Sequence, residues 1–490
     1  MNNKYININQ LLQKIGNEEL NERYVRYICG LDDSAKYHKR EISDINLLLK
    51  HIELNDLQSK NFLYGYVVPQ LSKEFDLLKV SSDKCVDIEL KSEPVPISKI
   101  KKQLVQNRHY LNIISSNIFL FTYVSSNNTL YTLTNGEVEE VSFDILKATL
   151  EFEGEQIDLD NVFTPSNILV SPLNNPDKFI EGKYLLTDHQ QVIKDRILDY
   201  IKDVGDERFF GLTGSAGTGK TLLIYDIAKE LSSTKKVLMV HSGIKCRGHY
   251  HISRCLPNLK IIEAKELRFR EIKDVDLIII DEAHRLYESL YDKVVRWTKR
   301  AKSICVFSLD SSQKMSISEN KRNTDENIKT ICGENIAELT GKIRTNKNIS
   351  LFIRCLLDLS KYQKNYEFKD VNVLFEPNEK KASDLAQKIK NELGYTYISY
   401  TPSSYSRELD YQNHGVNTHE VIGQEYDEVV MILNHHFYYD GNILNATNHP
   451  NPDYLFVKLL SQGLTRARSK ICLIVTTEDL LNRVLSLFNR

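Results

Sequence analysis

Residues 214–221 have the composition and spacing of a phosphate-binding loop. They read Gly-Ser-Ala-Gly-Thr-Gly-Lys-Thr and fit the pattern G-x-x-x-x-G-K-[ST] at every required position. Gly214, Gly217 and Gly219 allow a tight turn in which several backbone N–H groups point at one phosphate chain. Lys220 then neutralises the phosphates, and Thr221 offers its hydroxyl to Mg²⁺. The stretch therefore predicts a nucleotide site.

A second set of residues suggests metal-assisted hydrolysis of a phosphodiester. Residues 74–80 and 85–91 are predicted to form two antiparallel strands joined by a short turn. This hairpin brings Asp76 near Glu89 and Lys91, which project from the same strand face. We expect Asp76 and Glu89 to hold Mg²⁺, or Mn²⁺, while Lys91 orients the water or stabilises the developing charge. A row of charges on an exposed strand face is the simpler alternative.

The hairpin resembles the PD-(D/E)xK nucleases, and a predicted helix over residues 98–113 follows it at once. This sequence has Glu74-Phe75-Asp76 where the family has a Pro-Asp pair. Asp87 therefore remains an alternative to Asp76. The resemblance implies that a carboxylate in an earlier helix assists, for which Glu41 is the candidate, and that Gln103 contributes from the following helix.

The phosphate-binding loop lies where a strand meets a helix. Residues 209–212 suit a short buried strand, and residues 222–228 have helical periodicity. Farther on, the apolar run 275–280 ends in Asp281 and Glu282. A carboxylate at the carboxyl end of such a strand lies beside the phosphate loop in this fold class, so we expect Asp281 to complete the Mg²⁺ shell and Glu282 to activate the attacking water.

Further motifs follow in the order found in superfamily 1 DNA and RNA helicases. They are residues 186–190, 306–313, 339–346, 419–429 and 464–468. Taken together they resemble that superfamily. Within it, the sequence Asp-Glu-Ala-His-Arg at 281–285 most resembles the Schlafen group 3-like helicase domains of bacteria. The stretches between the motifs leave no room for large inserted subdomains, so translocation is expected more than robust unwinding.

The helicase resemblance implies a role for one or two residues in each motif. Gln190 reads adenine, Gln313 senses the γ-phosphate, Arg344 and Arg466 reach the phosphates from the second domain, and Gly423 and Glu425 belong to the nucleotide cleft. The implied cofactors are ATP and Mg²⁺. Cleft closure around ATP would then drive stepping along a single strand.

Alternation of strands and helices after residue 186 predicts an α/β protein. We expect a nuclease-like domain with a mixed sheet at 1–160, a linker at 161–180, and two RecA-like domains with doubly wound parallel sheets at 181–325 and 326–490.

Charge and composition limit the partners. The formal net charge of −2 over 490 residues gives no overall attraction for nucleic acid, so binding requires a local basic groove. Eight cysteines without a C-x-x-C pair are typical of reduced thiols in a cytosolic protein. No apolar run approaches the roughly 20 residues of a membrane helix. We therefore expect a cytoplasmic protein that does not bind membranes, with a homo-oligomer or a partner protein left open.

Two functional hypotheses follow. The first is an ATP-dependent translocase or helicase coupled to a metal-dependent nuclease, acting on DNA rather than RNA in bacterial antiviral defence or repair. The second is a nucleotide-controlled switch whose N-terminal domain binds nucleic acid or recruits a partner without cutting.

Overall fold

The computed structural model describes most of the chain in two compact units, Met1–Asn167 and Ile168–Arg490. The described residues are 4–12, 17–31, 38–68, 73–163, 170–203, 205, 207–340, 347–401, 415–447 and 454–488. The boundary between the units falls inside the predicted linker. Part of that segment is helical, because α6 (Leu159–Val162) and α8 (Pro176–Ile180) lie at its two ends.

Unit 1 is built on one mixed sheet. Over its described residues the sheet has six strands in the order β1-β2-β3-β4-β5-β6. The strands are β1 (Phe62–Val67), β2 (Glu74–Val80), β3 (Cys85–Lys91), β4 (Ile118–Val124), β5 (Thr129–Thr134) and β6 (Glu137–Glu140). Among the described strand pairs of this sheet, only β3–β4 is parallel. Helix α4 (Ile97–Leu111) connects these two strands and crosses back over the sheet, so that β4 begins at the same end as β3. The mixed sheet confirms the predicted fold class.

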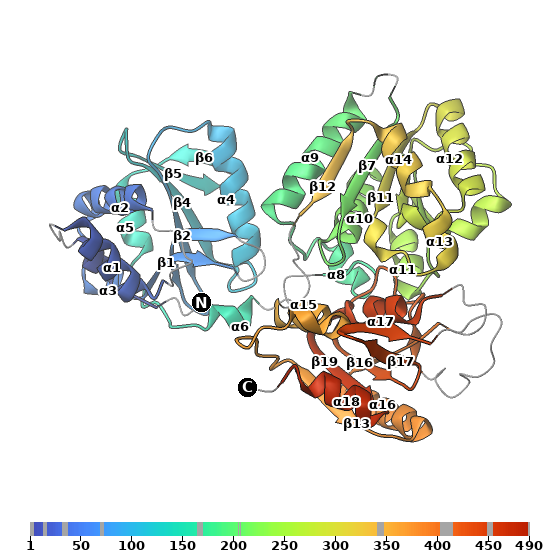
Figure 1. Ribbon diagram of the computed structural model, residues 1–490. Coiled ribbons are helices and arrows are strands. Elements are labelled where there is room, and N and C mark those ends of the chain that lie inside the picture. Colours follow the sequence, from blue (N-terminus) through green and yellow to red (C-terminus); the bar gives the residue numbers. More distant parts are fainter. Residues whose placement is uncertain are drawn as a thin grey trace. The chain divides into compact units, whose positions relative to one another are not determined.

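Helices cover both faces of this sheet (Figure 1). One face packs against α1 (Glu18–Cys29), α2 (Lys39–Ile52) and α5 (Phe143–Thr149), and α4 lies on the other. The remaining short helices of the unit are η1 (Ile8–Leu12) and α3 (Asp56–Ser59). The core contains Ile45, Leu48 and Ile88, which come from α2 and β3. Because side chains alternate along β3, its charged residues project to the α4 side.

Unit 2 contains two α/β lobes, of which lobe one runs from α8 to β12. The described strands of its sheet follow the order β12-β7-β11-β10-β8-β9, and every pair is parallel. They are β7 (Phe209–Gly214), β8 (Val237–His241), β9 (Leu259–Glu263), β10 (Leu277–Asp281), β11 (Ile304–Leu309) and β12 (Ile336–Leu339). We expected the second domain to begin at residue 326, but β12 pairs with β7, so lobe one extends to Leu339.

Helices pack on both faces of this sheet, as in a doubly wound fold. They are α9 (Asp188–Lys202), α10 (Lys220–Leu231), α11 (Arg247–Cys255), η2 (Ala264–Arg268), η3 (Ala283–Arg285), α12 (Glu288–Ala301), η4 (Ser311–Gln313), α13 (Ile317–Lys321) and α14 (Thr324–Cys332). Strands β8, β10 and β11 are buried along their whole length, which explains their nearly continuous apolar sequences.

Lobe two repeats this plan with a smaller sheet. In the part of the lobe that the structure describes, five parallel strands have the order β13-β19-β16-β14-β15, and β17 and β18 form a separate hairpin. The strands are β13 (Val371–Phe375), β14 (Thr396–Ser399), β15 (Val416–Asn417), β16 (Tyr426–Leu433), β17 (Phe437–Asp440), β18 (Ile443–Ala446) and β19 (Ala467–Val475). The helices are α15 (Lys347–Leu357), η5 (Leu359–Lys361), α16 (Glu379–Leu393), α17 (Phe456–Leu464) and α18 (Glu478–Leu485).

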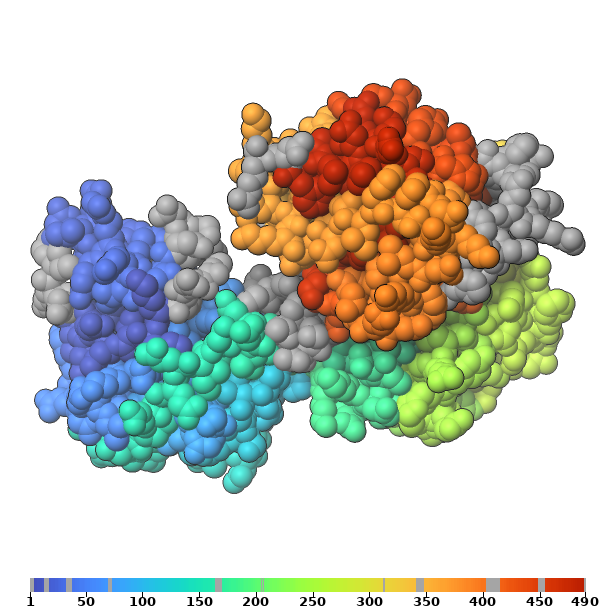
Figure 2. All heavy atoms as spheres, turned by 90° about the horizontal axis from the view of Figure 1, so that it is seen from below, coloured from blue at the N-terminus to red at the C-terminus, as the bar shows by residue number. Residues whose placement is uncertain are grey.

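Figure 2 shows the orange and red surface of lobe two against the green and yellow surface of lobe one. Among the described helices of both units, none is long and apolar enough to cross a lipid bilayer.

Candidate functional site

The phosphate-binding loop follows β7 and leads into α10. Gly217 and Gly219 have φ values of 80° and 89°, which side chains with a Cβ rarely adopt. A Cβ on Gly214 would lie 2.8 Å from the carbonyl oxygen of Leu339. The sequence needs glycine at these positions because the backbone turns sharply next to another strand.

Lys220 is 5% exposed and its ammonium lies across the mouth of the loop. Lys220 Nζ donates to the carbonyl oxygens of Gly214 and Ser215 at 2.6 and 3.1 Å. Nζ also lies 3.5 Å from Asp310 Oδ2. Sequence reasoning missed Asp310, although its place directly after β11 puts it at the same sheet edge as the loop.

Gln190 contacts the phosphate loop from α9. Its side chain closes a capping box with Thr187, and its Nε2 donates to the carbonyl oxygen of Thr218 at 3.2 Å. Its Oε1 accepts from the N–H of Thr187 at 2.9 Å. Both ends of the amide therefore have a protein partner, and the adenine contact expected from the sequence stays a prediction.

The two acidic residues at the carboxyl end of β10, Asp281 and Glu282, are buried next to the loop. Asp281 is fully buried, and its Oδ2 lies 3.9 Å from Nδ1 of His241. Glu282 is 5% exposed and adopts a left-handed backbone with a φ of 54°. Burial alone would raise the pKa of Glu282, but the neighbouring side chains of His284, Arg285 and Lys220 lower it to about 2. Glu282 is therefore ionised at neutral pH.

Arg285 and Gln313 connect these acids to lobe two. Arg285 Nε lies 3.4 Å from Glu282 Oε2, and Arg285 donates to the carbonyl oxygen of Gln313 at 3.0 Å. Arg466 of lobe two donates to Gln313 Oε1 at 3.2 Å. Glu282, Gln313 and Arg466, predicted separately, thus form one connected group across the two lobes. The contribution of Arg285 was not expected from the sequence.

Gly423 and Glu425, both predicted to belong to the nucleotide cleft, contact different parts of unit 2. A Cβ on Gly423 would lie 3.8 Å from Cγ2 of Thr221, so this glycine approaches the phosphate loop. Glu425 instead forms an ion pair with Arg468 at 3.0 Å, and both side chains are buried. The carboxylate of Glu425 therefore serves lobe two itself. Arg344 lies outside the described residues.

A short segment before α8, residues 170–175, lies between the two lobes. Asn174 Oδ1 accepts from the backbone N–H of Glu425 at 2.9 Å. On the other side, a Cβ on Gly248 of α11 would lie only 2.1 Å from the carbonyl oxygen of Leu173. This segment thus contacts lobe one and lobe two at once.

The acidic hairpin of unit 1 brings its predicted residues together. The N–H of Leu90 donates to Asp76 Oδ2 at 2.7 Å, and Lys91 Nζ lies 3.6 Å from Glu89 Oε2. Burial raises the pKa of Asp76 well above its usual range, and the charge of Glu89 raises it further. Asp76 and Glu89 are therefore close enough to repel each other, as two ligands of one cation would be.

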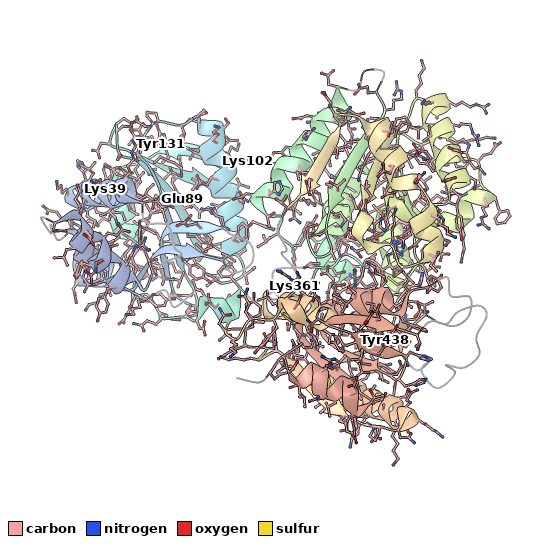
Figure 3. All side chains as sticks on the ribbon, in the orientation of Figure 1. Lys39, Glu89, Lys102, Tyr131, Lys361 and Tyr438 are labelled. Carbon is pink, nitrogen blue, oxygen red and sulfur yellow. The ribbon has the colours of Figure 1, made fainter. Side chains whose placement is uncertain are left out.

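Glu89, which is labelled in Figure 3, is surrounded by nitrogen donors. Its Oε1 accepts from Asn107 Nδ2 at 2.7 Å and lies 3.5 Å from Lys73 Nζ, and Gln103 donates to its Oε2. Asn107 also donates to Asp87 at 2.7 Å. Gln103 was predicted, and Asn107 could have been found because it lies one helical turn later. No local pattern indicated Lys73.

Glu41 lies at the margin of this cluster. Tyr64 donates to Glu41 Oε2 at 3.2 Å, and burial raises the pKa of Glu41. Over the described residues of both units, no group of three or more His, Cys, Asp or Glu side chains is arranged to hold a metal ion. The oxygen donors of the hairpin match Mg²⁺ in type, but the structure contains no complete metal centre.

The loop between β7 and α10 has the geometry of a phosphate-binding loop at a strand-to-helix junction. Residues 207–394 match the family described as Schlafen group 3, DNA/RNA helicase domain. This part of unit 2 is therefore similar to a Schlafen-type helicase domain, in agreement with the resemblance seen in the sequence. No curated protein matches the chain in sequence.

The search of solved structures matches the chain, at low similarity, to several helicases. The helicase of the virus PRRSV is 13% identical, with a TM-score of 0.32 over 58% of this chain and 56% of its own. An arterivirus helicase, nonstructural protein 10, is 12% identical, with a TM-score of 0.31 over 59% of this chain and 64% of its own. The Pif1 helicase from Bacteroides, solved with ADP-AlF3 and ssDNA, is 12% identical, with a TM-score of 0.34 over 60% of this chain and 94% of its own. The chain thus spans less than two thirds of either viral protein.

Proposed function

We propose that unit 2 is an ATP-driven nucleic-acid translocase. The observation that carries this proposal is the connected group of Lys220, Glu282, Gln313 and Arg466, which spans both lobes. Lys220 and Gln313 both contact Asp310, so the phosphate loop and the glutamine share one carboxylate. A change in the ligand at the loop is therefore transmitted to Arg466 of lobe two.

The residues divide the work of hydrolysis between them. The loop N–H groups and Lys220 bind the phosphate chain, and ionised Glu282 accepts a hydrogen bond from the attacking water. Thr221 and Asp281 would hold Mg²⁺, which neutralises charge on the phosphates. Arg466 and, by resemblance, Arg344 stabilise the transferring phosphoryl group from lobe two. Glu425 serves as a structural partner of Arg468, and Gly423 leaves room beside Thr221.

A surface at the carboxyl ends of β8 and β9 supports a nucleic-acid partner. A cavity of about 210 Å³ there is lined by Lys265, Arg268 and Tyr287 of lobe one together with His419 of lobe two. The ring of Tyr287 is half exposed, and the guanidinium of Arg322 lies 3.8 Å from its centroid. Exposed aromatic rings beside cations suit stacking of unpaired bases along a phosphate backbone.

We propose further that unit 1 is a metal-dependent nuclease fed by this translocase. The contacts of Asp76, Glu89 and Lys91 support the assignment, because they place two carboxylates and an ammonium in one cluster. Coupling a motor to a cutting site with little sequence readout would serve the destruction of foreign DNA, or repair, in bacteria. Asp87 is the alternative to Asp76.

One observation favours the second hypothesis, a nucleotide-controlled switch without cleavage. Glu89 already has Lys73, Asn107 and Gln103 as partners, so a metal ion must displace some of them. A protein that binds nucleic acid without cutting would show this same arrangement permanently.

The test measures ATP hydrolysis by the full chain with and without single-stranded DNA or RNA. We expect stimulation by single strands, and a loss of more than about a hundredfold in Lys220→Ala and Glu282→Gln. The control Lys299→Ala changes an exposed lysine of α12 and keeps full activity. ATP hydrolysis that survives both site changes would remove the motor assignment, whereas stimulation by RNA alone would correct the preference for DNA.

A further inference from the structure

A cavity of about 480 Å³ lies between the phosphate loop and lobe two. Lobe one contributes Ser215, Ala216 and Gln313 to its wall. Lobe two contributes one face of α15 and one face of α17, including Arg354 and Lys458. The volume is within the range of small-molecule sites, which is roughly 300–1,000 Å³.

The wall of this cavity carries a surplus of positive charge. Lys314 forms an ion pair with Asp325 at 2.9 Å, and Lys361 forms one with Asp358 at 3.7 Å. Lys361, labelled in Figure 3, lies just after α15. These four charges therefore cancel in two pairs.

Arg354 and Lys458 are different. Both are exposed cations on the cavity wall, and among the described residues neither has a carboxylate within ion-pair distance. Their helices bring them to the wall by periodicity, since Lys458 shares a face of α17 with Ser461 and Gln462, and Arg354 shares a face of α15 with Leu357. Two uncompensated cations facing a phosphate loop form a site for an anion.

The position within the cleft indicates which part of the nucleotide these cations meet. Ser215 and Ala216 form the first turn of the loop, and Ser215 O already accepts from Lys220 Nζ at 3.1 Å. Gln313, which lobe one also contributes to the wall, contacts Arg466 of lobe two. A phosphate chain bound by the loop would thus have its terminal group next to this cavity.

We propose that Arg354 and Lys458 bind the terminal phosphate of the nucleotide, so that lobe two distinguishes a triphosphate from a diphosphate. This inference rests on the nucleotide site proposed above. The two residues add to the arginines expected from the helicase motifs, and they lie outside those motifs. With these two cations, lobe two would contact the phosphate loop when ATP is bound and would be released when only ADP remains.

The test compares the affinity of the full chain for a non-hydrolysable ATP analogue and for ADP, by calorimetry with Mg²⁺. Arg354→Ala and Lys458→Ala should each weaken binding of the analogue about tenfold, because each removes one charge-assisted contact. ADP affinity should change less than about twofold, because ADP lacks the terminal phosphate. The control Lys380→Ala changes an exposed lysine of α16 outside the cavity wall and should alter neither affinity.

An unchanged ratio of analogue to ADP affinity in both variants would overturn the inference while leaving the nucleotide site intact. If the wild-type chain binds neither nucleotide, the proposed function itself fails. Arg354→Lys keeps the charge and should restore part of the analogue affinity, which a merely structural role would not predict. Both side chains are exposed, so the substitutions should not disturb the fold. Retained ADP binding would show that each variant is folded.

Discussion

The two candidate sites place buried carboxylates in opposite electrostatic surroundings. In unit 2, cations around Glu282 lower its pKa to about 2 despite its burial. In unit 1, burial and the neighbouring charge of Glu89 raise the pKa of Asp76 well above its usual range. The first site therefore keeps a buried carboxylate ionised by placing cations beside it, whereas the second crowds carboxylates and suits a cation.

The same contrast appears in the way each site is built. The nucleotide site draws its residues from the carboxyl ends of parallel strands, where the backbone geometry of the sheet brings them together. The hairpin site depends on side-chain contacts, such as that of Leu90 N–H with Asp76. We therefore expect the first site to bind its ligand with little rearrangement and the second to rearrange around Glu89.

The largest expected effect separates the two activities completely. Lys91→Ala should reduce Mg²⁺-dependent cleavage of DNA more than about a hundredfold, because the cluster loses its ammonium. ATP hydrolysis should remain at the wild-type rate. Lys220→Ala should instead abolish ATP hydrolysis. Cleavage of short substrates, measured without ATP, should stay at the wild-type rate.

The control for Lys91 is Lys99→Ala, an exposed lysine near the start of α4. Cleavage rates are measured with Mg²⁺ and with Mn²⁺. A wild-type chain that never cuts DNA or RNA in either metal contradicts the nuclease and favours the binding switch.

A moderate effect is expected at the proposed nucleic-acid surface of unit 2. Tyr287→Ala should weaken binding of single-stranded DNA about tenfold, because one stacking ring is lost. Fluorescence anisotropy without nucleotide provides the measurement. The matched control is Tyr438→Ala, which changes a partly exposed ring of the β17–β18 hairpin, labelled in Figure 3. Equal losses in both variants would show that the surface is elsewhere.

The smallest effect concerns the stability of unit 1. A carboxyl whose pKa is raised by folding binds more protons in the folded unit than in the unfolded chain, so stability falls as pH rises above the ordinary pKa of aspartate. Asp76→Asn removes this titration, and its amide oxygen can still accept from Leu90 N–H. We expect the variant to melt a few degrees above the wild type at pH 8, with a smaller difference at pH 5.

Thermal unfolding in the two buffers measures this difference, with Glu153→Gln as the control for an exposed carboxylate. Added Mg²⁺ should stabilise the wild type more than Asp76→Asn, since a bound cation relieves the repulsion. A difference between wild type and variant that is the same at both pH values would refute the electrostatic explanation.

Features that depend only on neighbouring residues could be predicted from patterns in the sequence. The hairpin strands 74–80 and 85–91 match β2 and β3, since alternation and a turn signal depend only on neighbouring residues. The acids at the carboxyl end of β10 and the loop after β7 lie at one sheet edge, because parallel strands share their carboxyl ends. The α/β class was predictable for the same reason.

Contacts between distant segments were not predictable from such patterns. Lys73 reaches Glu89 through the arrangement of unit 1, and β12 joins the first sheet by pairing with β7. In both instances a partner far along the chain decided the outcome.

The segment at residues 170–175 has a practical consequence for dissecting the protein. The family match begins at residue 207, yet Asn174 supports lobe two and Gln190 supports the phosphate loop. Phe179 and Ile197 are fully buried in the core of lobe one. A recombinant fragment cut at the family boundary would expose that core and separate the lobes from their shared contact. The smallest piece expected to work alone therefore begins at residue 168.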